Sequence, residues 1–172
     1  MPGVVDGIAR SMLAIELDEG GEWIAWLDCG HRRHLRHRPP LSSMPWLLDA
    51  AARAARVGQR IECGRCAQCE PPSSLRAGRL AAFDEHTLPA GLRAEHRLRE
   101  GAWARLEIDA GELRFVMPML AIDRVLGPGD AQWIPPAVEP HVAPGPTVRV
   151  RLSFFRVADR DPQQQLANSQ QS

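Results

Sequence analysis

The chain has 172 residues, a length that suits one ordinary domain or two small ones. Its 21 basic and 21 acidic residues cancel, which disfavours nucleic-acid binding because a duplex binder normally carries a broad excess of cations. All basic residues other than histidine are arginine, so the arginines within residues 32–38 carry little functional information. No stretch resembles a signal peptide or a membrane span, and we therefore expect a cytoplasmic protein with no membrane partner.

The amino-terminal half begins with the pattern of a β-hairpin. Met12–Leu17 and Trp23–Leu27 are short apolar-rich runs separated by a polar turn that contains Gly20 and Gly21. Paired glycines accept the positive φ angles that tight turns require. The second run leads directly to Cys29, so the hairpin is expected to support the first cysteine.

A helix is predicted over residues 45–57, and a short strand after it. The segment is rich in alanine and leucine, has Pro45 in its first turn and stops at Gly58. Residues 60–62 form the predicted strand, which delivers Cys63. Polar, proline-rich residues follow, so we place a first domain at 1–72 and a linker at 73–79.

The carboxy-terminal half has the pattern of short strands. Residues 102–108 alternate apolar with polar side chains, and a turn is predicted at 109–112. Further strands are predicted at 122–126, 132–134 and 147–157. This spacing indicates a small barrel or sandwich over 80–158, followed by a disordered tail at 159–172.

The cysteines and histidines predict a metal site in the first half. Cys29, Cys63 and Cys66 with one histidine make a tetrahedral set of the kind that binds structural zinc. His31 and His34 compete for the fourth place, and the spacing slightly favours His34, with the other histidine in a supporting role. His37 and Cys69 are outside candidates.

Two other interpretations of this half stay open. Cys63-Gly64-Arg65-Cys66 has the form of a redox dithiol, although such a thiol requires a helix to begin after it, and here Cys69 and two prolines follow closely. Alternatively, the arginine-rich turn at 32–38 presents its charges to a partner protein.

The cluster resembles an uncharacterised bacterial family of small Cys/His-rich domains. The shared elements are Gly20-Gly21-Glu22-Trp23, Cys29-Gly30-His31 with His34, Arg36-His37 and Pro39-Pro40, Pro45-Trp46, and Cys63 with Cys66. Arg33 and Met44 depart from the family pattern. The resemblance covers residues 7–70 and implies a fold but no activity.

The second half is similar to TehB/YeaR-like proteins of the tellurite-resistance group. The similarity spans residues 86–157 and rests on Thr87-Leu88-Pro89-Ala90-Gly91, Glu95-His96, Gly101-Ala102-Trp103, Ile134-Pro135-Pro136, His141-Val142 and Ser153-Phe154-Phe155. It implies a cupin-like β barrel and a link to tellurite, nitrate or oxidant stress. The chain has no glycine-rich cofactor loop after a strand, so the methyltransferase activity of that group is not carried over.

The same resemblance gives His96 and His141 as a second metal or ligand site. The usual second histidine and glutamate of a catalytic cupin are not evident, and Ala104 stands near the expected glutamate. Glu95, Glu100 or water could complete a divalent-metal site. Hydrogen-bonded buried histidines are the competing interpretation.

These observations together predict a mainly β protein with a small α+β module. A zinc-ribbon-like hairpin/helix domain precedes the small cupin-like barrel. We expect a stress-associated binding or sensing protein with a small-molecule or oxyanion ligand, and the cupin resemblance allows a homodimer. The alternative is a metal-dependent cupin enzyme, an oxygenase or oxyanion-processing protein, that uses His96 and His141.

Overall fold

Strands dominate the computed structural model, which describes residues 6–93 and 98–159 and confirms the prediction of a mainly β protein. The amino-terminal half forms a four-stranded sheet in the order β3-β2-β1-β4. Its strands are β1 (Ile8–Leu17), β2 (Trp23–Leu27), β3 (Arg32–His34) and β4 (Arg60–Cys63).

The predicted hairpin is present as the antiparallel pair β1 and β2. Gly21 has a φ of 74°, and the Asp18 carboxylate accepts hydrogen bonds from the backbone N–H groups of Gly20 and Glu22. These contacts hold the turn that the glycines permit. β4 pairs with the other edge of β1, where Cys63 lies opposite Ile8.

The helix predicted over 45–57 is interrupted. The structure has a 3-10 helix η1 (Pro45–Leu48) and a short helix α1 (Ala50–Ala54), with Asp49 in an extended conformation between them. The Asp49 carboxylate accepts a hydrogen bond from the Ala52 N–H at 2.7 Å. Aspartate is a favoured N-cap, so it starts a new helix instead of continuing the first one.

The carboxy-terminal half forms a second sheet in the order β5-β9-β6-β7, with β8 paired to β6. A short helix α3 (Ala90–Arg93) follows β5, and a 3-10 turn η2 (Pro118–Leu120) follows β6. The strands are β5 (Leu75–Asp84), β6 (Ala102–Met117), β7 (Ile122–Leu126), β8 (Ala131–Ile134) and β9 (His141–Val157).

Three boundaries differ from the sequence prediction. Residues 109–112 are not a turn but part of β6, whose pairing with β9 shifts register between Ile108 and Ala110 and between Gly111 and Leu113. Such bulges bend a strand without ending it. β5 begins at Leu75, so most of the expected linker is strand, and β9 begins six residues earlier than predicted. Of the predicted disordered tail, residues 160–172 lie outside the described part of the chain.

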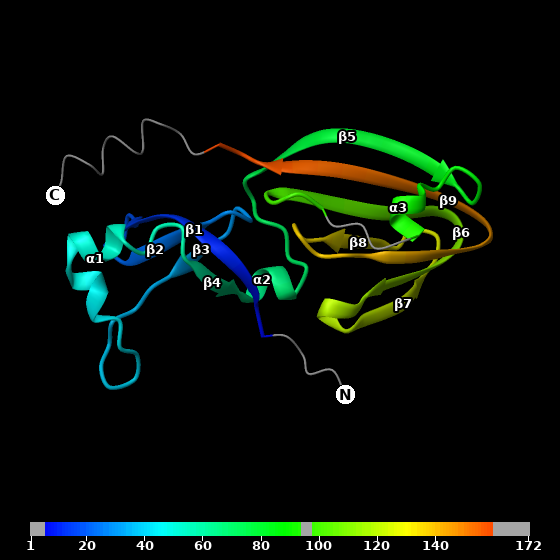
Figure 1. Cartoon of the computed structure of the whole chain (residues 1–172). Coiled ribbons are helices and arrows are strands. Elements are labelled where there is room, and N and C mark those ends of the chain that lie inside the picture. The colour runs from blue at the N-terminus through cyan, green and yellow to red at the C-terminus, as the bar shows by residue number, and fades with distance from the viewer. Residues whose placement is uncertain (1–5, 94–97, 160–172) are drawn as a thin grey trace.

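The two sheets lie side by side and share one hydrophobic cluster (Figure 1). The indole N–H of Trp103 in β6 donates a hydrogen bond to the Cys29 carbonyl, and the Arg10 guanidinium in β1 donates one to the Pro136 carbonyl. Pro72 and Val157 pack against Gly30. Among the described residues, no helix combines the length and apolar character needed to cross a membrane.

Candidate metal centre

Four buried side chains from three parts of the amino-terminal half converge on one point. Cys29 and His31 lie in the turn between β2 and β3, where Gly30 has a φ of 87°. Cys63 ends β4, and Cys66 lies in the four-residue helix α2 (Gly64–Ala67) that follows. A left-handed glycine at position 30 turns the backbone so that the side chains on both sides of it point the same way.

The ligand atoms are spaced as a tetrahedral metal site requires. The Nδ1 atom of His31 is 3.5 Å from the Cys29 sulfur, 3.4 Å from that of Cys63 and 3.7 Å from that of Cys66. The Cys29 and Cys63 sulfurs are 3.9 Å apart, and all four atoms lie within 4.8 Å of one another. Tetrahedral zinc with ordinary bond lengths places two sulfurs about 3.8 Å apart and a sulfur about 3.5 Å from a nitrogen. These residues can therefore hold a metal ion.

His31, and not His34, completes this group. His34 ends β3 with its side chain half exposed, and its Nδ1 lies 3.2 Å from a carboxylate oxygen of Glu22. Arg36 and Arg38 pair with the same carboxylate. The sequence-based preference for His34 does not fit this geometry, because His31 shares the tight turn with Cys29 whereas His34 lies beyond it on a strand.

Mutual hydrogen bonding shifts the pKa values of the three thiols in different directions. Hydrogen bonds from Cys29 and Cys66 hold the pKa of Cys63 well below its ordinary value. The hydrogen bond to Cys63 raises the pKa of Cys29 to about 12, and hydrogen bonds to Cys29 and Cys63 raise the pKa of Cys66. The three sulfurs and the His31 Nδ1 atom thus lie close enough to share protons. A metal ion replaces these protons, because thiolates are the ligands it binds.

Trp103 and Arg10 enclose the cluster. The Trp103 ring meets the His31 ring edge-on at 5.7 Å and 87°, and it is fully buried. The His31 Nε2 atom is buried without a hydrogen-bond partner among the described residues, so the imidazole is oriented by its Nδ1 contacts with the sulfurs and by packing against Trp103. Arg10 is 1% exposed, and its positive charge acts on the Cys66 thiol. The sequence did not predict either contact with the cluster, since both contacts join distant segments.

The two outside candidates have other partners or positions. His37 Nδ1 accepts a hydrogen bond from the Met44 N–H at 2.9 Å. Cys69 is buried with a φ of 55°, and burial raises its pKa to about 11. A helix does begin after Cys63, contrary to expectation, but it is only four residues long. The arrangement of three thiols around His31 fits a metal-binding site better than a redox-active pair of cysteines.

The second predicted site is only partly described. His96 and Glu95 lie outside the described residues. His141 is half-buried at the start of β9, opposite Val116, and Glu100 is exposed. Within residues 6–93 and 98–159, the only group of three or more potential metal ligands is the cysteine–histidine cluster. Trp103 packs on that cluster, and Trp133 packs against Phe155, with ring centroids 5.0 Å apart.

Two family profiles match separate parts of the chain. Residues 14–70 match the family described as "Protein of unknown function (DUF3565)". Residues 79–152 match the family described as "TehB-like domain". No curated protein matches the chain.

Solved structures resemble about half of the chain at low identity. TehB from Haemophilus influenzae is 16% identical over 49% of this chain and 32% of its own, with a TM-score of 0.45, so this chain spans about a third of its length. A protein from Escherichia coli K12 is 17% identical over 51% of this chain and 96% of its own, with a TM-score of 0.46. A cupin-2 domain protein from Shewanella frigidimarina is 12% identical over 47% of this chain and 70% of its own, with a TM-score of 0.33.

The family matches coincide with the two sheets. The first contains all four residues of the metal centre, and the second runs from Arg79 in β5 to Leu152 in β9. The chain thus joins a segment that matches the DUF3565 profile to a segment that matches the TehB-like profile.

Proposed function

We propose that this chain is a zinc-containing binding or sensing protein of the cytoplasm, linked to tellurite or other oxidant stress. Zinc is held by Cys29, His31, Cys63 and Cys66, and the TehB-like domain binds a small molecule or oxyanion. Support for zinc comes from the donor set, because three thiolates and one imidazole are typical of structural zinc sites. The stress link rests on the TehB-like match and on the resemblance to tellurite-resistance proteins.

The position of Trp103 is the observation that carries the sensing role. This side chain contacts the Cys29 carbonyl and the His31 ring, while its neighbours in β6, Ala102 and Ala104, line a cavity of the carboxy-terminal half. Successive residues of a strand point to opposite faces. One face of β6 therefore contacts the metal centre and the other face lines the ligand cavity. Through this strand, a structural change at either site would alter the other site.

Charge balance supports a closed structural site. Zinc with three thiolates and a neutral imidazole carries one net negative charge, and an unpaired buried charge is strongly unfavourable. Arg10, itself buried beside the cluster, supplies the compensating positive charge. All four ligands are buried, which leaves no open coordination position for a substrate.

Metal content of the intact chain tests the zinc assignment. We expect one zinc ion per chain, lost together with cooperative folding when a strong chelator is added, as in small zinc domains. Cys63→Ser should prevent zinc binding. A chain that holds no zinc, or that keeps its unfolding transition in chelator, would refute the assignment. If the wild type instead held a second metal ion per chain, and His141→Ala lost it, the cupin-enzyme alternative would be favoured over the binding role.

Tolerance to tellurite tests the stress link. We expect the intact chain to raise the tellurite tolerance of a sensitive bacterial host, and Cys63→Ser to raise it less. His34→Ala, which leaves the metal ligands in place, is the matched control. Tolerance no higher than that of the empty vector would refute the link.

Dimerisation through the carboxy-terminal half stays a prediction, which sedimentation of the intact chain would measure.

A further inference from the structure

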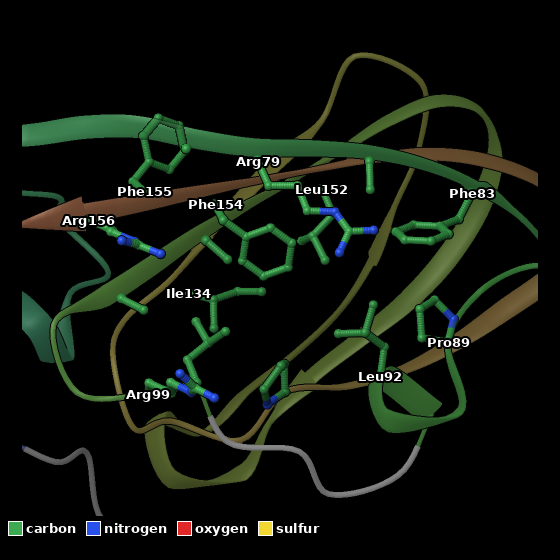
Figure 2. A pocket seen from close by; sticks show the side chains of 16 residues that line it. Arg79, Phe83, Pro89, Leu92, Arg99, Ile134, Leu152, Phe154, Phe155 and Arg156 are labelled. Atoms are coloured by element: carbon green, nitrogen blue, oxygen red, sulfur yellow. The ribbon is translucent and has the colours of Figure 1, made fainter.

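A cavity of about 740 Å³ opens in the carboxy-terminal half (Figure 2). β5, β6, β8 and β9 contribute residues to it, and so does the segment around α3. Its volume lies within the range of small-molecule sites, which is roughly 300–1,000 Å³. It lies on the face of β6 that carries Ala102 and Ala104, opposite the face that carries Trp103.

The inner wall of the cavity is apolar. Leu152, Ile134 and Ala104 are buried in it, and the rings of Phe83 and Phe154 are half-buried at its sides. Small side chains make the space: Ala104 lies opposite Ile134 in one strand pair and opposite Phe154 in the other. An apolar wall of this kind gains free energy by covering an apolar ligand surface.

Three arginines provide the charge of the cavity. Arg79 in β5, Arg156 in β9 and Arg99 before β6 line it, and no carboxylate is among the lining residues that the structure describes. Figure 2 shows the Arg79 guanidinium between the rings of Phe83 and Phe154, with Arg99 and Arg156 toward one end. All three are exposed, and none is in an ion pair with a described residue.

We propose that this cavity binds a small organic anion, whose apolar body fills the cavity while its carboxylate or similar group is held by Arg79, Arg99 and Arg156. Guanidinium groups recognise such planar anions through paired hydrogen bonds. The proposal rests on the binding role proposed above and adds the ligand class. An inorganic oxyanion such as tellurite or nitrate would use the arginines but leave the apolar wall uncovered, so the two ligand classes are separable.

Calorimetric titration of the zinc-loaded intact chain with decanoate tests this. Decanol is its uncharged counterpart, and nitrate and tellurite are the inorganic counterparts. We expect decanoate to bind about tenfold or more tightly than decanol, the ratio expected when charge-assisted hydrogen bonds are lost. Binding should weaken as salt rises, because the arginines are exposed.

Matched variants locate the binding. Arg79→Gln with Arg156→Gln should weaken decanoate binding about tenfold or more, whereas Arg149→Gln, an exposed arginine of β9 outside the cavity, should leave it within about twofold. Ala104→Leu should weaken decanoate and decanol alike by filling the cavity. Zinc content and circular dichroism report whether that variant folds, and the arginine variants test the site independently because they alter exposed side chains.

Each contrary outcome has a distinct meaning. Equal binding of decanol and decanoate, or no loss in the double arginine variant, would overturn the organic-anion site. Tellurite or nitrate binding without decanoate binding would also overturn it, while leaving the proposed binding role intact. No binding of any of these compounds would overturn both the cavity site and the proposed ligand-binding role. Zinc content is measured separately and is unaffected by that result.

Discussion

Trp103 donates its indole N–H to the backbone carbonyl of Cys29 at 2.9 Å, across 74 positions of the sequence. Trp103 is fully buried, and its ring also packs edge-on against His31. One side chain of the carboxy-terminal half therefore holds the turn that supplies two residues of the candidate metal centre in the other half. The metal centre depends on both parts of the chain.

Trp103→Phe should lower the free energy of unfolding by about 1–3 kcal/mol, because it leaves a buried carbonyl without its donor. Urea unfolding of the zinc-loaded protein measures this. Trp133→Phe is the matched control: Trp133 is half-buried, and its indole N–H has no hydrogen bond to a described residue. Equal stability losses in the two variants would show that the bond to Cys29 contributes nothing particular.

His31→Ala should abolish stoichiometric zinc binding, whereas His34→Ala should retain it. Only His31 lies beside the three sulfurs, and the His34 variant loses exposed contacts with Glu22 and Asp18, each worth at most about 1 kcal/mol. Zinc content after dialysis against a weak chelator distinguishes them. Retention of zinc in the first variant and its loss in the second would assign the fourth ligand to His34.

Arg10→Ala should destabilise the zinc-loaded protein by about 3–5 kcal/mol, the usual cost of removing one partner from a buried charge pair. It would leave the Pro136 carbonyl without its donor and the zinc centre without a counter-charge. Arg10→Lys should recover part of the loss. Chemical unfolding at fixed free zinc measures it. A loss below about 1 kcal/mol in Arg10→Ala would mean that this charge does not balance the centre.

Cys69 should make stability fall as pH rises from 9 to 11. Burial raises its pKa from the ordinary 9.0 to about 11, so in this range the unfolded chain releases a proton that the folded chain keeps. Stability is complete below pH 9 and drops by on the order of 3 kcal/mol above pH 11. The difference between the wild type and Cys69→Ala, unfolded in urea at pH 8 and pH 10, isolates this effect. A pH-independent difference would contradict it.

Gly111→Ala should prevent stable folding, while Gly129→Ala should cost only about 1–2 kcal/mol. Both glycines have positive φ angles, 74° and 88°. A Cβ at Gly111 would clash with the Thr147 carbonyl oxygen, whereas one at Gly129 would meet nothing within 4 Å. Soluble yield and thermal unfolding compare the two. Similar stability in both would mean that β6 and β9 separate easily at the bulge.

Local patterns in the sequence were enough for several elements. Glycines in a polar turn between apolar runs predicted the β1–β2 hairpin, and alternation predicted the first half of β6. Both signals depend on neighbouring residues alone. The prediction of one continuous helix over 45–57 was wrong. The capping aspartate, Asp49, starts a second short helix despite the helix propensity of the residues around it.

The sequence by itself determined the donor types of the candidate metal centre: three cysteines and a nearby histidine are the ligands that zinc prefers, provided that the fold brings them together. Tertiary structure decided that His31 is the histidine, that Trp103 and Arg10 enclose the cluster, and that β6 separates it from an arginine-lined cavity. These features depend on contacts between residues far apart in the chain. Such contacts are fixed by how two sheets pack, and no local periodicity encodes that packing.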